Sequence, residues 1–297
     1  MTETLSLADQ PLLNGEFDHF TDVTTLSAAG NIGVMHRLLT LGTGGAPAAT
    51  VSRQSFVTAP YPQPAGNPPM EGDPTGFLDF FLRWAQTALA STTNPEFQTR
   101  IEHVRTLAGE QKIVYRGWYR SNVALQVGLR QNFGAGGAPS ADVDTALQTL
   151  PATGDASGVI QWRVFKLYFV LPSIATKTLG TTVNTSFLAV RILGPLNATF
   201  QYDLSDIALH RADFEGVPRR RTYWEAFFNL QRYFISASVF APVSTQSANG
   251  YLFPRQMRIA PAITGAGATH ANITVDGASI ISTGAAANIA LTADARL

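Results

Sequence analysis

The sequence predicts an all-β protein: an antiparallel β-sandwich, then one connecting helix, then a small C-terminal β region. Short apolar runs are separated by clusters of Gly, Pro, Asn and Ser at intervals of roughly 10–20 residues, which is typical of a sandwich or barrel. The clearest runs alternate apolar and polar residues with a period of two. No helical pattern lies between these runs, so a parallel sheet covered by helices is disfavoured.

Six segments carry the strand signal most clearly. In the first four, large apolar side chains fall on one face and mostly polar ones on the other, as expected of strands with one buried face. The segments are Phe77–Trp84, Ile113–Arg120, Ala124–Phe133, Trp162–Val170, Phe187–Leu193 and Ala198–Leu209. Between the first two, one helical turn is expected within Thr92–Val104.

Gly and Pro mark the loops of the predicted sandwich. Thr58–Gly76 holds six prolines. Proline lacks the amide donor that a central strand needs, so we expect a long loop there. The Gly-rich strings at 42–45 and 134–137 have no lysine and no strand-to-helix context, so we expect turns rather than phosphate sites.

A change of composition after Asp213 marks a second region. Thr222 and Glu225 have the spacing of a capping box, the signature of a helix N-terminus. Apolar residues then recur at helical spacing, at Tyr223, Phe227, Leu230 and Phe234. We expect this stripe to pack in the core or at a subunit interface.

Beyond the helix, weaker strand signals continue to the end of the chain. The expected strands are Ser236–Pro242, Leu252–Ile263, Asn272–Val275, Ser279–Ser282 and Asn288–Thr292. The tail Thr264–Leu297 has few large apolar residues, so we expect it to pack between chains rather than to form a core alone. The predicted organisation is a leader at 1–12, a sandwich at 13–213, and the helix with the small β region at 214–297.

Composition excludes several classes of protein. The 297 residues include 21 basic and 21 acidic ones, so the zero net charge argues against a nucleic-acid partner. The absence of cysteine excludes thiol nucleophiles, disulfides and Cys-ligated zinc. Neither a signal peptide nor a membrane-spanning apolar run is expected. Charged residues make up only 14% of the chain, which suits dense packing in an assembly.

The sequence offers no arrangement that predicts catalysis. The five histidines are scattered, and no nucleophile elbow, Walker A or dinucleotide motif occurs. Carboxylates for a glycosidase pair are present, but none has a supporting arrangement. We therefore expect a protein that is not an enzyme.

One group of oxygen-bearing residues is a candidate calcium site. Asn14 and Glu16 precede the first strand, and Asp203 and Asp206 fall in a late one. If the first and last strands are neighbours, these oxygens converge, and Ca²⁺ prefers such ligands. The alternative is that Asn14 starts a turn and the aspartates cap strand ends.

A second group is a candidate glycan-binding face. Flat aromatic rings stack on sugars, and planar polar side chains hydrogen-bond their hydroxyls. The outer faces of two consecutive predicted strands supply both kinds of side chain, at Arg116, Trp118, Arg120, Gln126, Arg130 and Asn132. The alternative is a solvated or loop-covered face on which arginine stacks on tryptophan for packing alone.

A series of motifs resembles a domain of bacteriophage tail-fibre and virion-surface proteins. The matching segments occur in the same order as in that family: Asn14–Asp18, Val51–Phe56, Arg100–Gly109, Leu129–Gly134, Leu171–Ser173 and Asp203–Leu209. Two later segments, Gln231–Phe234 and Met257–Pro261, are similar to elements of fibre tips. Two positions depart from the pattern, because His103 replaces an aspartate and Gly117 stands where an aromatic residue precedes the tryptophan.

The resemblance implies a jelly-roll sandwich like that of carbohydrate-binding modules, on a phage virion protein that forms trimers. It also implies a structural calcium ion near Asn14, Glu16 and Asp203. The short polar leader suggests a compact decoration, head-fibre or adaptor-tethered tip protein rather than a long fibre.

We therefore expect a non-enzymatic homotrimer on the virion surface that contacts other virion proteins and host-surface glycan. Two alternatives remain: a capsid cement or decoration protein without sugar binding, and a glycan depolymerase.

Overall fold

The computed structural model describes most of the chain in two compact units, Met1–Arg221 and Thr222–Leu297. The described residues are 25–32, 35–56, 80–107, 112–154, 160–183, 185–212, 234–241, 249–254, 257, 260–266, 268–274, 276–282 and 287–294. Their regular structure consists of antiparallel strands, and no helix occurs among them. The all-β prediction is confirmed for this part of the chain. The predicted helix over Thr222–Phe234 falls outside it, except that Phe234 begins a strand.

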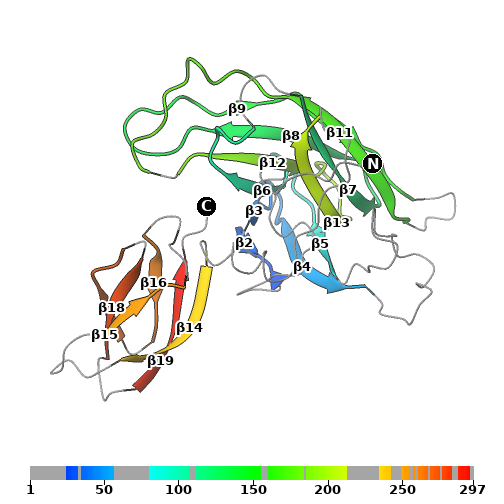
Figure 1. Ribbon diagram of the computed structural model, residues 1–297. Helices are drawn as coiled ribbons and strands as arrows, with labels where there is room; N and C mark the ends of the chain where they lie inside the picture. Colours follow the sequence, from blue (N-terminus) through cyan, green and yellow to red (C-terminus); the bar gives the residue numbers. More distant parts are fainter. Residues whose placement is uncertain are drawn as a thin grey trace, which may run out of the picture. The chain divides into compact units, whose positions relative to one another are not determined.

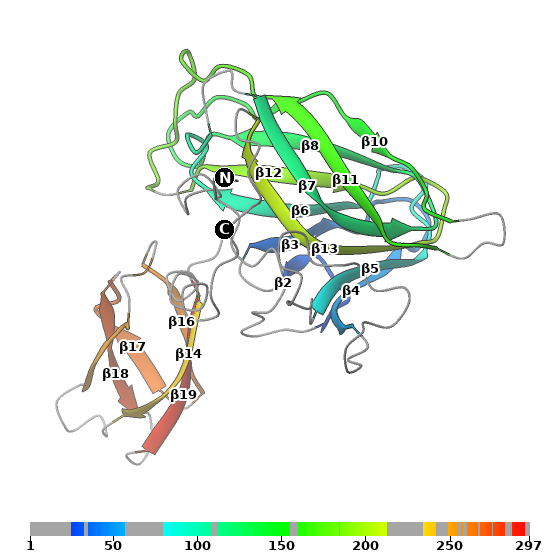
Figure 2. The same ribbon diagram turned by 45° about the vertical axis from the view of Figure 1, so that its right-hand side comes forward.

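Two sheets form the first unit (Figures 1 and 2). The first sheet has, in spatial order, β1 (Thr25–Leu26), β4 (Ala48–Ser55), β5 (Phe80–Ala88), β13 (Phe200–Arg211), β7 (Lys112–Ser121) and β11 (Arg163–Val170). The second has β10 (Gln148–Leu150), β8 (Leu125–Asn132), β12 (Phe187–Leu193), β6 (Glu96–Glu102), β3 (His36–Thr40) and β2 (Gly30–Ile32), with β9 (Val143–Asp144) beside β8.

The core lies between these two sheets. Alternation along each strand directs every second side chain inward, as in β7, where Ile113, Tyr115 and Tyr119 are buried. Trp84 of the first sheet is fully buried, and its ring centroid lies 6.1 Å from that of Phe97 in the second sheet. The first unit is therefore an antiparallel β-sandwich.

All six clearly predicted strands overlap observed ones, but the expectation for Thr92–Val104 is wrong. This segment contains β6, a strand between β12 and β3. Phe97 and Ile101 point into the core, whereas Glu96 and Gln98 lie on the outer face, where they are also buried. The expected helical turn fails because the segment alternates with the period of a strand.

β13 contains an irregularity that reaches its neighbour β7. The pairing register shifts between Ser205 and Ala208, and Asp206 takes a φ of 50°. A Cβ atom on Gly117 would lie 2.9 Å from Ile207 Cγ2 and 3.1 Å from Asp206 O. The bulge thus accounts for glycine at a position where the related motif has an aromatic residue.

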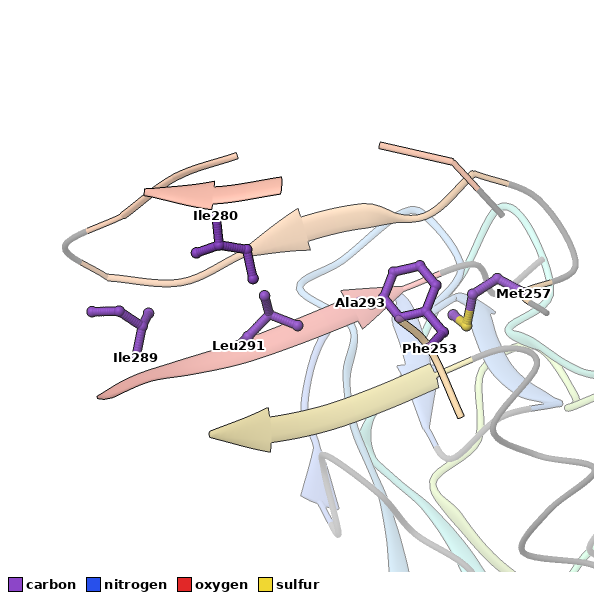
Figure 3. Packing of buried hydrophobic residues seen from close by; sticks show 6 residues of the cluster. All are labelled: Phe253, Met257, Ile280, Ile289, Leu291 and Ala293. Atoms are coloured by element: carbon purple, nitrogen blue, oxygen red, sulfur yellow. The ribbon is translucent and has the colours of Figure 1, made fainter. Parts of the chain in front are cut away.

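The C-terminal unit has two small sheets of its own. One contains β14 (Phe234–Ala241), β19 (Ala287–Asp294) and β16 (Ala262–Thr264), and the other contains β15 (Asn249–Leu252), β18 (Gly277–Ser282) and β17 (Ala268–Ala271). A buried apolar cluster gathers side chains from both sheets (Figure 3), namely Phe253, Met257, Ile280, Ile289, Leu291 and Ala293. Phe253 and Met257 precede the tail Thr264–Leu297, so the tail does not form this core alone, and its packing between chains stays a prediction.

The strand predictions for this unit are confirmed in part. Ser236–Pro242 overlaps β14, and Ser279–Ser282 and Asn288–Thr292 lie in β18 and β19. Leu252–Ile263 is not one strand, since β15 ends at Leu252 and β16 starts at Ala262. Asn272–Val275 is also wrong for its described residues, because β17 ends at Ala271 and Asn272 has a φ of 48°.

Candidate functional site

The six residues of the predicted glycan-binding face divide between the two sheets. Arg116, Trp118 and Arg120 lie on β7 in the first sheet, whereas Gln126, Arg130 and Asn132 lie on β8 in the second. Their outer faces are on opposite sides of the sandwich. The expectation of one continuous face is therefore wrong, because β7 and β8 are consecutive in sequence but are not paired.

The true neighbours of the β7 residues are on β11 and β13. Trp118 pairs with Val164 and Ser205, and Arg116 pairs with Lys166 and Ala208. Val164 is 56% exposed, whereas Trp118 is half-buried. The indole Nε1 of Trp118 is enclosed without a hydrogen-bond partner. The aromatic ring of Trp118 therefore lies next to β11, which is the edge strand of this sheet.

Tyr168 extends the same face along β11. It lies on the same side as Val164 and Lys166, its side chain is 53% exposed, and the Lys166 amine lies 5.4 Å from its ring centroid. Sequence alternation already put Lys166 and Tyr168 on one side of their strand. What it lacked was the pairing of β11 with β7, which makes them neighbours of Trp118. We call Arg116, Trp118, Lys166 and Tyr168 the Trp118 face.

Arg116 is the more enclosed cation of the Trp118 face. Burial lowers its pKa from the ordinary value, and the charge of Asp206 acts in the opposite direction. An enclosed guanidinium has directed donors with little freedom to reorient. Such donors suit the hydroxyl groups of a bound ligand.

Arg120, the third predicted residue on β7, is occupied by a different contact. Its Nε donates to Asp203 at 2.6 Å, and Arg83 donates two hydrogen bonds of 2.8 Å to the same carboxylate. The Arg120 guanidinium also lies 4.9 Å from the Trp162 ring and 5.4 Å from the Phe81 ring. Its role here is to neutralise a buried carboxylate and to pack on aromatic rings.

The three predicted residues on β8 have partners within their own sheet. Gln126 donates to the Thr149 hydroxyl, Asn132 donates to Asp142, and Arg130 forms two hydrogen bonds with Asp144. These contacts satisfy the planar groups that the sequence offered for sugar recognition. The second sheet therefore carries a charged network on its outer face, whereas Trp118 and Tyr168 lie on the outer face of the first.

Of the two described residues of the candidate calcium site, Asp203 and Asp206, Asp203 is already paired with arginines, and calcium binding by the predicted site stays a prediction. The Asp203 side chain has no exposed surface, and both of its oxygens accept hydrogen bonds from arginines. A Ca²⁺ ion at this carboxylate would meet two guanidinium charges at close range. Asn14 and Glu16 lie outside the described residues, so their part in a calcium site stays a prediction. In the described part of the chain, no group of three or more His, Asp or Glu residues is placed to hold a metal.

A pocket of about 180 Å³ lies elsewhere on the first unit. Its lining includes His103, which departs from the related motif and takes a φ of 72°. The pocket is smaller than the roughly 300–1,000 Å³ usual for ligand sites. It is therefore not the site of an extended ligand.

No helix among the described residues is long and apolar enough to cross a membrane. The chain matches no protein-family model, and no curated protein matches it.

Comparison with solved structures finds distant similarity. The family 11 carbohydrate-binding module from Clostridium thermocellum aligns at 9% identity over 69% of this chain and 95% of its own, with a TM-score of 0.32. The enzymatically active domain of tailspike protein 4 from bacteriophage CBA120 aligns at 9% identity over 68% of this chain and 21% of its own, with a TM-score of 0.37. A CBM4 structure aligns at 15% identity over 44% of this chain and 70% of its own, with a TM-score of 0.29. At TM-scores this low, the ligands of these proteins do not transfer to this chain.

Proposed function

We propose that this protein binds carbohydrate without transforming it, and that the Trp118 face of the first sheet is the binding surface. The observation that carries the proposal is the pair of aromatic residues, Trp118 and Tyr168, on one face with Arg116 and Lys166 between them. Rings of this kind stack on sugars, and the two cations donate hydrogen bonds to hydroxyl groups.

The spacing of these rings favours an oligosaccharide over a single sugar. Trp118 pairs with Val164, and Tyr168 lies four residues further along β11. With a rise of about 3.3 Å per residue, the two rings are roughly 13 Å apart along the strand direction. A chain of several sugar rings spans this separation, and repeated weak contacts add up to useful affinity.

The setting we propose for this activity is the surface of a phage virion, with the chain folded as a jelly-roll type of sandwich and assembled as a homotrimer. The support is the collinear series of motifs and the low content of charged residues. Light scattering of the purified chain tests the trimer, which a monomeric mass would contradict.

A purely structural decoration role is the second candidate, and one observation favours it. The edge strand β11 exposes Val164, Tyr168 and Val170 to 56%, 53% and 58%. An exposed apolar row at a sheet edge is also the kind of surface that contacts another protein. A glycan depolymerase is the third candidate and differs from the first by releasing sugar.

A glycan array of the purified full chain tests the proposal and separates it from the structural role. We expect binding to at least one glycan class, and a loss of roughly fivefold to tenfold in Tyr168→Ala and Trp118→Ala, which each remove one ring contact. Tyr168 is half-exposed, so its variant retains the core and keeps the test informative. Leu252→Ala, at an exposed residue of the C-terminal unit, is the control. The absence of binding, or unchanged binding in both ring variants, would contradict the proposal.

A further inference from the structure

The outer face of the second sheet carries a row of alternating charges. Arg191 donates two hydrogen bonds of 2.7 Å to Glu96, and it also contacts Asp144. Arg130 donates to Asp144 at 2.8 and 2.9 Å. Glu96 and Asp144 are thus paired with Arg191 and Arg130, and Asp142 lies 3.6 Å from Arg130. Among the residues that the structure describes, no ion pair joins these three carboxylates to the remaining arginines of this face.

Arg100 and Arg37 stand at the other end of this row. The Nε of Arg100 donates to Gln98 Oε1 at 2.8 Å, and its guanidinium lies 4.3 Å from the centre of the Phe187 ring. Arg37 pairs across the strands with Gln98, and its Nε is enclosed without a hydrogen-bond partner. Neither guanidinium forms an ion pair within the described ranges.

Holding the charges of Arg37 and Arg100 at this partly buried place is energetically unfavourable. The pKa of Arg100 is lowered to about 10, chiefly by burial and then by the charge of Arg37, while the charges of Glu96 and Asp142 act in the opposite direction. Arg100 nevertheless stays charged at neutral pH. Two neighbouring, partly buried cations with no ion-pair partner among the described side chains repel each other and lose hydration. A fold retains such an arrangement most readily where a ligand supplies the missing negative charge.

A polar acceptor lies opposite Arg37 on the neighbouring strand. Asn31 pairs with Arg37 across β2 and β3, and its side-chain oxygen is enclosed without a partner. This part of the sheet therefore combines guanidinium donors with an acceptor and an aromatic ring, that of Phe187. An anionic group attached to a hydroxyl-bearing molecule matches this combination better than a bare ion does.

We propose that Arg37 and Arg100 form a binding site for an oxyanion, a carboxylate or sulfate group carried by an acidic saccharide. The planar guanidinium forks match both oxyanions with paired hydrogen bonds. The site is separate from the Trp118 face, because it lies on the other sheet. The saccharide part of the proposal rests on the carbohydrate binding proposed above, whereas the oxyanion part does not.

Titrations of the full chain with three probes test the site: glucuronate, glucose as its neutral counterpart, and inorganic sulfate. Binding is followed through the NMR signals of the arginine Nε–H groups. We expect glucuronate and sulfate to shift the signals of Arg37 and Arg100, and glucose to leave them in place. Arg37→Gln and Arg100→Gln should each weaken glucuronate binding by about tenfold, the loss of a charge-assisted hydrogen bond.

Two further variants serve as controls for this experiment. Arg163→Gln removes the same charge at an exposed position of the first sheet and should leave binding unchanged. Arg100→Lys keeps the charge but loses the fork, so its affinity should fall between those of the wild type and Arg100→Gln.

The three probes separate the outcomes. If neither anion shifts the Nε–H signals of Arg37 and Arg100, the proposed oxyanion site is wrong, whatever the Trp118 face binds. Sulfate binding without glucuronate binding would overturn the saccharide as its ligand. Equal responses to glucose and glucuronate would show that the charge is not recognised, which also overturns the proposal.

Discussion

Asp203 has two arginine partners that are far from it in the chain. Arg83 and Arg120 reach its carboxylate from the two strands on either side of β13. From sequence alone, an aspartate near the end of a motif offers oxygen ligands for calcium. Strand alternation indicates which face a residue is on, but the identity of the facing arginines depends on pairing between distant strands. That is why the sequence identified Asp203 as special but gave no sign of its partners.

The buried charge of Asp203 leads to a stability prediction. Asp203→Ala leaves Arg83 and Arg120 without their shared counter-charge, so we expect a loss of about 3–5 kcal/mol in the free energy of unfolding. Asp142→Ala is the matched control, because Asp142 is 37% exposed and lies 3.6 Å from Arg130. That control should change stability by no more than about 1 kcal/mol. Urea unfolding measures both, and equal losses in the two variants would count against the description of Asp203.

Two carboxylates of the second sheet predict how stability depends on pH. Burial raises the pKa of Glu96, but hydrogen bonds from Arg191 and Gln98 outweigh this and hold it below the ordinary value. The hydrogen bond from Arg130 and the charge of Arg191 lower the pKa of Asp144. The folded state therefore binds protons more weakly at these groups than the unfolded state does. Their contribution is complete above the unfolded pKa of about 4 and is lost as the pH falls through the folded values.

Urea unfolding between pH 6 and pH 2 measures this dependence. We expect the free energy of unfolding to fall with pH, and to fall less steeply in Glu96→Gln, which has no proton to gain there. An identical slope in the wild type and the variant would show that Glu96 does not contribute.

At the scale of elements, the sequence predicts the positions of the strands better than it predicts which strands pair with each other. The period of two in β7 and β8 correctly put Ile113 and Leu125 in the core and Trp118 and Arg130 on outer faces. The same pattern is silent about which sheet a strand joins, since consecutive strands of a sandwich often cross between sheets. The sequence therefore wrongly predicts that the three site residues of β8 share a face with the three of β7. Tyr168 was not identified for the same reason, because its strand pairs with β7 across a long stretch of chain.

The bulge of β13 requires glycine at position 117. In Gly117→Ala, the added methyl group would meet Ile207 and the carbonyl groups of the bulge, so the strands must shift. We expect a loss of about 1–3 kcal/mol in the free energy of unfolding, typical of an overpacked site. A Cβ at Gly154 would meet nothing within 4 Å, so Gly154→Ala is the control. Thermal unfolding compares the two, and an unchanged melting temperature in Gly117→Ala would mean that the bulge can adapt.

At the scale of the whole molecule, the C-terminal unit shows how few large apolar residues a small core needs. Its tail, Thr264–Leu297, is rich in small residues, so the sequence predicted that the tail would not form a core alone. The structure gathers the few that exist at facing positions of two small sheets, where Ile280 and Leu291 are fully buried. Phe253 and Met257, which precede the tail, complete this cluster, so residues from outside the tail supply part of its core.

Because each unit has its own core, we expect a core mutation in one unit to leave the stability of the other unchanged. Leu291→Ala should destabilise the C-terminal unit by about 2–5 kcal/mol, the usual cost of a buried cavity. Amide hydrogen exchange should then speed up in β14, β16 and β19 and stay unchanged in β12 of the first unit. Leu252→Ala, 78% exposed, should change neither. Faster exchange in β12 would show that the two units do not unfold separately.

The central claim is that this protein holds a glycan and leaves it intact. The most direct measurement incubates the full chain with a polysaccharide that it retains on the array, and quantifies bound sugar and newly formed reducing ends in the same sample. Saturable binding with no new reducing ends is the expected result. Release of reducing ends, or the lack of any retained polysaccharide, would contradict the claim.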